Sequence, residues 1–133
     1  MRRFRIALLL LPALAFAADA PAPVTPKPLH LVLVGDSTVN DHSGWGSGFR
    51  RFVTEDARVT NAAQNGRSSK SFIAEGHLAK ALALKGDYYL IQFGHNDMKE
   101  RGPNVGAFTS YKDDLKRLVA SVKTKGGRPV KSS

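Results

Sequence analysis

Residues 31–39 read Leu-Val-Leu-Val-Gly-Asp-Ser-Thr-Val, so four apolar residues run without a break into a Gly-Asp-Ser turn. An unbroken apolar run that ends in a turn signal is typical of a strand buried on both faces. The carboxyl ends of buried parallel strands face the crevice in which α/β folds bind ligands. Ser37 follows such an end beside Gly35, which allows a sharp turn, and is a candidate nucleophile. The simpler interpretation is a strand followed by a polar loop.

The chain has 133 residues, which is enough for one small domain. Its hydrophobic content of 42% is ordinary for a globular protein. The mean hydropathy of −0.24 argues against a membrane protein. There is no cysteine, so no disulfide can form in any compartment.

The first residues have the pattern of a secretory signal. Three arginines, at positions 2, 3 and 5, precede the apolar run Ile6–Ala17, and small residues offer cleavage sites after Ala17 or Ala20. We expect residues 1–20 to be a signal peptide and the protein to be secreted or periplasmic; the alternative is an uncleaved anchor. After cleavage we expect no stable membrane insertion. The alternate prolines of residues 21–28 predict an extended linker, so the domain is expected over residues 29–133.

The chain is basic, with a formal net charge of +9. Removal of residues 1–20 takes away three arginines and one aspartate, which leaves +7 on the mature chain. Such an exported protein could bind an acidic polysaccharide or an anionic envelope. Seven basic side chains fall within Lys112–Lys131, where they are typical of the solvated face of a helix. No aromatic residues alternate with them, so we expect no nucleic-acid partner.

After the first strand, helical and strand patterns alternate. Trp45 lies among closely spaced glycines that predict a loop, and it is either a wall of a substrate cleft or a core anchor. The elements expected next are a short helix over 49–56 with Phe49, Phe52 and Val53 inward, a strand over 58–61, a helix through 74–84 interrupted by Gly76, a strand over 88–93, a helix from about Val105, and the start of a fourth strand at 128–130.

Strands that alternate with helices indicate right-handed βαβ units and a parallel sheet. The last of the helices repeats apolar residues at three and four positions, beginning at Phe108. In the flavodoxin-like order, the first strand lies between the second and the third. The strand over 88–93 would then lack an outer neighbour, and its unpaired edge would favour aggregation.

Two later turns add polar groups to the same predicted edge of the sheet. Residues 61–72 read Asn-Ala-Ala-Gln-Asn-Gly-Arg-Ser-Ser-Lys-Ser-Phe, which predicts a strand end that turns into a helix. Backbone N–H groups at such a turn suit a developing negative charge. The strand over 88–93 runs into Gly94-His95-Asn96-Asp97. Gly66 could also be only a helix-entry turn, and Asn96 only a loop residue that caps its own backbone.

Taken together, Gly35-Asp36-Ser37-Thr38, Gly66-Arg67-Ser68-Ser69 and Gly94-His95-Asn96-Asp97 resemble the motifs of the SGNH (GDSL-like) hydrolases. Within that superfamily the chain is most similar to the rhamnogalacturonan acetylesterase branch, from about His30 to Val130. The resemblance implies a three-layer α/β/α flavodoxin-like parallel sheet, incomplete at the C-terminus. It also implies that Ser37 is the nucleophile, and that the oxyanion hole consists of the Ser37 and Gly66 N–H groups with the Asn96 side-chain amide.

One element of the family pattern is absent. The later Asp-x-x-His block, whose histidine is the general base, has no counterpart, because none of the four histidines follows an aspartate by three positions. His95 could reach the cleft, although the family does not use that position as the base. We therefore expect residues 29–133 to be the N-terminal part of a longer hydrolase domain, inactive by itself.

The resemblance implies an exported esterase that removes acetyl groups from a polysaccharide of the rhamnogalacturonan or pectin type, without metal or organic cofactor. Its partners would be the acetylated polysaccharide or a small ester. The alternative is a non-catalytic fragment or pseudoenzyme that at most binds acidic polysaccharide.

Overall fold

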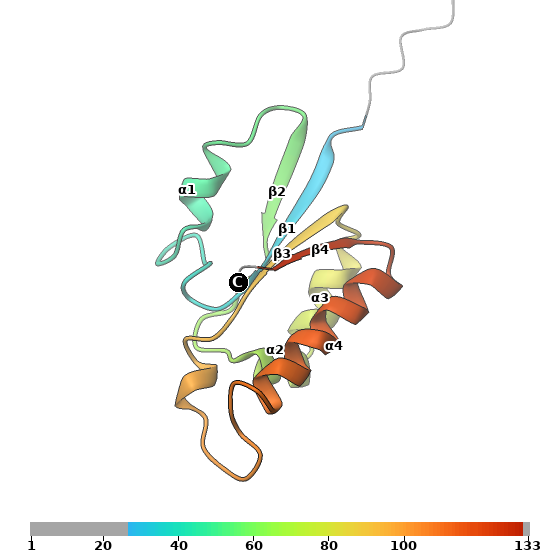
Figure 1. The fold of residues 1–133 in the computed structure, drawn as a ribbon. Helices are drawn as coiled ribbons and strands as arrows, with labels where there is room; N and C mark the ends of the chain where they lie inside the picture. Colours follow the sequence, from blue (N-terminus) through green and yellow to red (C-terminus); the bar gives the residue numbers. More distant parts are fainter. Residues whose placement is uncertain (1–26, 132–133) are drawn as a thin grey trace, which may run out of the picture.

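The computed structural model describes residues 27–131, in which four parallel strands alternate with helices (Figure 1). The sheet order is β2-β1-β3-β4. In chain order, the elements are β1 (Leu29–Gly35), α1 (Gly46–Arg50), β2 (Ala57–Asn61), α2 (Ser69–Ala74), α3 (His77–Ala83), β3 (Tyr88–Gln92), the short 3₁₀ helix η1 (Asp97–Lys99), α4 (Ser110–Thr124) and β4 (Arg128–Lys131).

Strand β1 lies at the centre of the sheet, as its apolar run predicted. It pairs with β2 on one side, with Leu33 opposite Asn61, and with β3 on the other, with Val34 opposite Ile91. The side chains of Val32, Leu33 and Val34 are fully buried. The predicted α/β class and the position of the first strand between the second and the third are confirmed.

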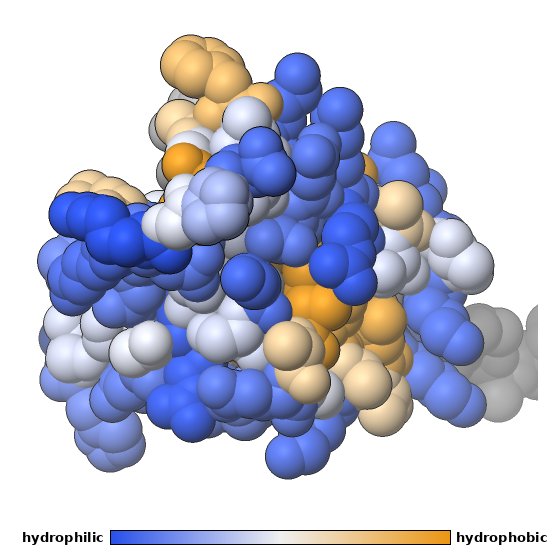
Figure 2. Space-filling model, turned by 90° about the horizontal axis from the view of Figure 1, so that it is seen from below, coloured by the Kyte–Doolittle hydropathy of each residue, from blue (hydrophilic) through white to orange (hydrophobic). Residues whose placement is uncertain are grey.

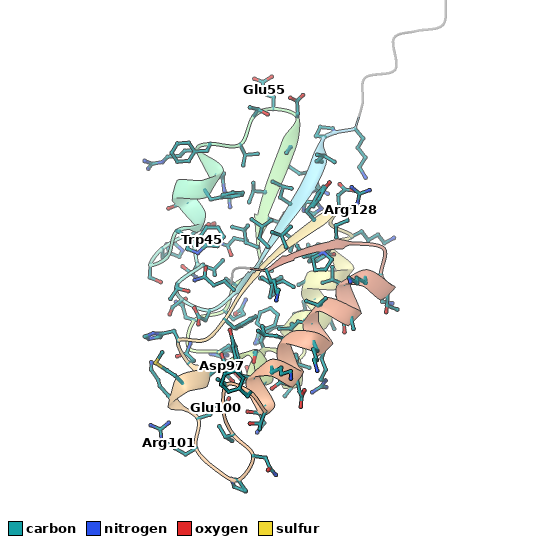
Figure 3. The ribbon with its side chains drawn as sticks, viewed as in Figure 1. Trp45, Glu55, Asp97, Glu100, Arg101 and Arg128 are labelled. Atoms are coloured by element: carbon teal, nitrogen blue, oxygen red, sulfur yellow. The ribbon has the colours of Figure 1, made fainter. Side chains whose placement is uncertain are left out.

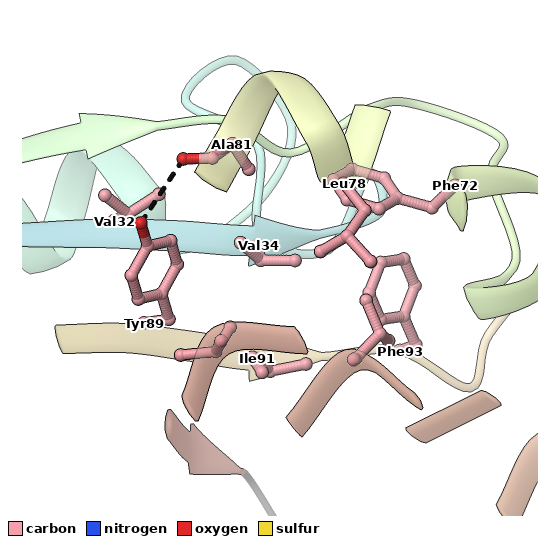
Figure 4. Packing of buried hydrophobic residues seen from close by; sticks show 10 residues of the cluster. Val32, Val34, Phe72, Leu78, Ala81, Tyr89, Ile91 and Phe93 are labelled. Carbon is pink, nitrogen blue, oxygen red and sulfur yellow. Dashed lines mark hydrogen bonds between the residues drawn. The ribbon is translucent and has the colours of Figure 1, made fainter. Parts of the chain in front are cut away.

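Helices cover the two faces unequally. On one face, α2, α3 and α4 enclose the larger apolar cluster, in which the rings of Phe72 and Phe93 meet edge to face with centroids 5.2 Å apart (Figure 4). On the other face, a smaller cluster contains Leu33, Val39 and Ala63 with Trp45 and Phe49 against it. Of the helices described, only the five-residue α1 contributes to this second layer.

Glycine divides the helical segment after β2 into two helices, at the position predicted from the sequence. Gly76 has φ +79°, which is in the left-handed region that favours glycine. Helix α2 begins with a capping box: the Ser68 hydroxyl accepts a hydrogen bond from the Ser71 N–H, and the Ser71 hydroxyl accepts one from the Ser68 N–H. This cap fixes the direction in which the chain enters α2.

The helix predicted over residues 49–56 is wrong in its position. Helix α1 begins at Gly46, inside the segment predicted as a loop, and ends at Arg50. Phe52 was expected to point inward but is 88% exposed. Gly46 is buried so tightly that an added Cβ would collide with the Asn61 side chain and the Val39 carbonyl. Because glycine has no side chain, the first residue of α1 can pack this closely. The glycine-rich sequence pattern does not reveal this packing.

The last helix starts later than predicted. Its apolar pattern was extended back to about Val105, but α4 begins at Ser110, and Phe108 is 89% exposed. Thr109, directly before the helix, has φ −115° and ψ −105°, a backbone conformation that is not helical, so the helix cannot extend back through it. Figure 2 shows the molecule from the end at which this loop lies, and there hydrophilic side chains surround a smaller apolar area.

The expectation that the third strand lacks an outer neighbour is also wrong. Gly126, at φ +81°, turns the chain after α4, and β4 returns alongside β3 with Tyr88 opposite Arg128. Gly127 lies so close to the Tyr89 ring that an added Cβ would be 2.6 Å from it. The close approach of this turn to the core therefore requires glycine, and it allows four further residues to form a strand.

The expected signal peptide (residues 1–20) and most of the expected linker (21–28) lie outside the described residues. Within residues 27–131, no helix is both long enough and apolar enough to cross a membrane. The same residues contain no group of three or more His, Cys, Asp or Glu side chains placed to hold a metal ion.

His30 lies at the opposite end of β1 from Ser37 and should make stability depend on pH. Its side chain is buried; the ring Nδ1 accepts from Arg58 (2.9 Å), and Nε2 donates to the Thr60 hydroxyl (2.8 Å). Burial, with the Arg58 charge, lowers the pKa of His30 from its ordinary value of 6.5; Asp87 opposes this shift. Because the folded pKa is the lower one, the free energy of unfolding should fall as pH decreases below about 6.5.

Urea unfolding at pH 7, 6 and 5 measures this dependence. His30→Gln should unfold with a smaller loss between pH 7 and pH 5 than the parent chain. His42→Gln, which changes an exposed histidine, should keep the parent's dependence. An equal loss of the free energy of unfolding in His30→Gln and in the parent would contradict the assignment of this pH dependence to His30.

Candidate active site

Three turns meet at the carboxyl edge of the sheet. Because β1, β2 and β3 are parallel, the residues that follow Gly35, Asn61 and Gln92 emerge at the same edge. The Gln64 N–H donates to the Gly35 carbonyl oxygen at 2.9 Å, which joins the first turn to the second. The sequence-predicted residues Ser37, Gly66 and Asn96 all lie on these turns.

Asp36 builds the turn that carries Ser37. Its Oδ1 accepts from the Thr38 N–H (2.8 Å) and the Thr38 hydroxyl (2.7 Å). Its carbonyl oxygen accepts from the N–H groups of Val39 (3.1 Å) and Asn40 (3.3 Å). Asp36 is fully buried, and its Oδ2 has no hydrogen-bond partner within residues 27–131. The carboxylate therefore fixes a single helical turn, with the half-buried Ser37 as its first residue.

Two backbone donors are available on these turns. Neither the Ser37 N–H nor the Gly66 N–H donates a hydrogen bond to any described residue. Gly66 is exposed with φ +73°, and an added Cβ would meet nothing within 4 Å. Its backbone conformation, rather than a lack of space, therefore favours glycine here.

Asn96 supplies a side-chain donor. Its Nδ2 donates to the Arg67 carbonyl oxygen at 3.2 Å, which leaves its second N–H available. Its Oδ1 accepts from Lys99 Nζ at 3.4 Å, and both bonds orient the amide. Asn96 and Gly66 also line the same shallow depression, together with Ser68, Ser71, Lys99 and Glu100.

The two residues suggested for the cleft have other contacts. His95 is exposed, and its Nε2 accepts from Lys99 Nζ at 3.1 Å. Trp45 donates from Nε1 to the Gln92 side-chain oxygen at 2.6 Å and meets Phe49 edge to face, with ring centroids 5.7 Å apart. These contacts fit a core anchor, but half-buried Trp45 also lines a hollow with Leu90 and Val130, so both roles considered for it stay predictions.

Sequence reasoning did not predict the groups that join the second turn to the third. The Asp97 carboxylate accepts from both the N–H and the hydroxyl of Ser69, and the Ser68 hydroxyl donates to Glu100. Asp97 and Glu100 both lie on the segment that follows β3 (Figure 3). The Tyr111 hydroxyl donates to the Phe93 carbonyl oxygen at 2.9 Å. Burial, with the nearby charges of Asp97 and Asp36, raises the pKa of Tyr111, so this donor stays protonated.

Comparison with known proteins identifies relatives over about three quarters of the chain. The chain is 40% identical over 114 residues to rhamnogalacturonan acetylesterase RhgT of Bacillus subtilis, a match that covers 78% of this chain and 48% of RhgT. In three dimensions it superposes on the crystal structure of the B. subtilis protein YxiM with a TM-score of 0.67 and 24% identity, over 79% of this chain and 32% of YxiM. It superposes on an acetylxylan esterase from Geobacillus stearothermophilus with a TM-score of 0.62 and 21% identity, over 80% of this chain and 60% of the esterase chain.

The fold is that of the SGNH hydrolases. The sequence resemblance to this superfamily, and to its rhamnogalacturonan acetylesterases in particular, is therefore confirmed. No protein-family model matches the chain. The chain spans about half the length of RhgT and of a second B. subtilis relative, the probable rhamnogalacturonan acetylesterase YesY.

The Geobacillus acetylxylan esterase was solved as catalytic mutants of a histidine and of the aspartate three positions before it. No such pair occurs in the present sequence. Within the described residues, no histidine forms a hydrogen bond with Ser37.

Proposed function

We propose that this chain carries the nucleophile and the oxyanion hole of an exported carboxylic-ester hydrolase that removes acetyl groups from a polysaccharide of the rhamnogalacturonan type. The observation that carries the proposal is the meeting of Ser37, Gly66 and Asn96 at one sheet edge, each with an available donor. The identity of 40% to a rhamnogalacturonan acetylesterase supports the substrate class.

In the proposed reaction, Ser37 Oγ attacks the acetyl carbonyl carbon while a base removes the hydroxyl proton. The carbonyl oxygen becomes an oxyanion, which accepts hydrogen bonds from the Ser37 and Gly66 N–H groups and from Asn96 Nδ2. Collapse of this intermediate breaks the bond to the sugar oxygen, which leaves with the proton. Water then attacks acetyl-Ser37 and releases acetate, which restores the hydroxyl. None of these steps requires a metal or an organic cofactor.

The base is the missing part of this scheme. Ser37 is a neutral alcohol unless an imidazole accepts its proton, and His95 Nε2 already accepts from Lys99. We therefore propose that turnover by these 133 residues alone is slow, and that an added imidazole base increases it.

Export belongs to the same proposal. The arginines that precede the apolar run Ile6–Ala17 support a signal peptide over residues 1–20. A secreted or periplasmic location would bring the protein to polysaccharide outside the cytoplasm.

A second candidate is a non-catalytic chain that binds acidic polysaccharide. It is favoured by the exposed Lys112, Lys116 and Lys123 of α4, with Lys131 on β4. Such a chain would bind polygalacturonate in a salt-dependent way but would leave its acetyl groups in place.

The test is acetate release from acetylated rhamnogalacturonan by the purified chain, with and without added imidazole. We expect release above that caused by imidazole alone, together with a protein species one acetyl group heavier in the quenched reaction. The acetylated peptide should contain Ser37. Binding without acetate release and without acetylated protein would favour the second candidate instead.

A further inference from the structure

The carboxylate of Asp97 joins two of the three turns at the candidate site. Its Oδ1 accepts from the Ser69 N–H at 3.0 Å and also from the Ser69 hydroxyl. Its Oδ2 accepts from the Gly94 N–H at 3.1 Å. Ser69 is fully buried. Hydrogen bonds to an ionised acceptor are roughly twice as strong as those between neutral groups, so the two bonds from Ser69 form a strong polar link between the second and third turns.

Two neighbouring hydrogen bonds also join the second turn to the third. The Asn96 amide bonds to the Arg67 carbonyl at 3.2 Å, and the Ser68 hydroxyl bonds to Glu100. Three consecutive residues of the second turn are thus each bonded to the third turn. Asp97 lies at the buried end of this row, directly after Asn96 in the chain.

The Gly66 N–H and the Asn96 amide, the two proposed oxyanion-hole donors outside the Ser37 turn, lie on the turns that these hydrogen bonds join. Gly66 precedes Ser69 by three residues, and Asn96 is bonded covalently to Asp97. Hydrogen-bond donors stabilise a transition state only when they are held at the position where charge develops. A displacement of about 1 Å can cost about a hundredfold in rate.

We propose that Asp97 is a positioning residue that holds the Gly66 N–H and the Asn96 amide in register through Ser69 and Gly94. This proposal rests on the proposed function. Asp97 is not a candidate for the missing base, because its two oxygens already accept three hydrogen bonds from the Ser69 and Gly94 donors. It acts on the turns and does not touch the reacting atoms.

The test compares Asp97→Asn with Asp113→Asn, which changes an exposed aspartate of α4 whose nearest cation, Lys116, is 3.9 Å away. In Asp97→Asn, the introduced amide would place an N–H group against one of the present donors. Using p-nitrophenyl acetate with added imidazole, we expect Asp97→Asn to lower the Ser37-dependent kcat by about tenfold to a hundredfold, with KM within about twofold. Asp113→Asn should behave as the parent chain.

A second readout does not depend on turnover. In ¹H–¹⁵N spectra, Asp97→Asn should shift the Gly66 N–H and the Asn96 side-chain amide resonances, and Asp113→Asn should not. Ser69→Ala removes only the hydroxyl contact, so it should cause smaller shifts and a smaller loss of kcat. It also provides the test if Asp97→Asn does not fold. In the double variant the losses should not add, because both remove one link.

The outcomes separate the two proposals. If the parent shows no Ser37-dependent hydrolysis, the proposed function fails, and the spectra alone decide whether Asp97 positions the two donors. If hydrolysis depends on Ser37 but Asp97→Asn keeps the parent kcat, the positioning role is overturned and the proposed function stands. Unchanged Gly66 and Asn96 resonances in Asp97→Asn and Ser69→Ala would also overturn it.

Discussion

Replacing Ser37 by alanine is expected to abolish the enzymatic part of ester hydrolysis, so that p-nitrophenyl acetate is cleaved no faster than by imidazole and buffer alone. The hydroxyl is the only group of the proposed site that forms a bond to substrate, and no other residue can replace it. In a serine protease with a complete triad, loss of the nucleophile costs about a millionfold in kcat. The loss of kcat expected here is smaller, because the base is supplied from solution.

The matched control is Ser47→Ala, which removes an exposed hydroxyl from α1. It should keep the parent rate, and thermal unfolding of both variants should show that the fold is retained. Hydrolysis at the parent rate by Ser37→Ala, or an acetyl group found on another residue, would show that the nucleophile is wrongly assigned.

The sequence predicted the framework of the domain because the framework depends on local patterns. The apolar run before Gly35 is short, contains two valines and ends in a turn signal, which together favour a strand buried on both faces. Gly76 interrupts the helix at the predicted position because its left-handed conformation excludes most other residues. The alternation of strands and helices was then enough to predict a parallel sheet with β1 inside it.

The errors fall where packing overrides the local pattern. Phe52 and Phe108 continue an apolar spacing but are exposed, because the helices that would bury them end or begin two residues away. Apolar spacing alone cannot locate such an end, since a residue such as Thr109 sets the start of α4 through its non-helical backbone angles. The pairing of β4 with β3 was missed because it depends on the close packing of Gly127 against Tyr89.

The candidate site shows the same division. The motifs predicted which residues would share the sheet edge, since strand ends determine that. They could not predict the bonds from Asp97 to Ser69, which lie 28 residues apart in the chain. One signal was present in the sequence, namely a serine pair at a helix start and an aspartate beside Asn96. Only the tertiary arrangement shows that these groups meet.

Asn96→Ala is expected to lower the Ser37-dependent kcat by about a hundredfold or more, with little change in KM. The reason is the orientation of the amide: Nδ2 donates one hydrogen to the Arg67 carbonyl and Oδ1 accepts from Lys99, which leaves one N–H to point at a substrate. An uncharged acetyl oxygen accepts only weakly, whereas the tetrahedral oxyanion accepts strongly. The lost interaction therefore belongs mainly to the transition state.

Steady-state kinetics with p-nitrophenyl acetate and a constant imidazole concentration distinguish this role from a simpler one. Asn104→Gly is the control, because it removes an exposed amide at φ +61° without strain. It should leave both constants unchanged. If Asn96→Ala instead raised KM at constant kcat, the amide would bind the ground state and the transition state equally. Asn96 would then be a substrate-binding residue, and the oxyanion would rely on the Ser37 and Gly66 N–H groups alone.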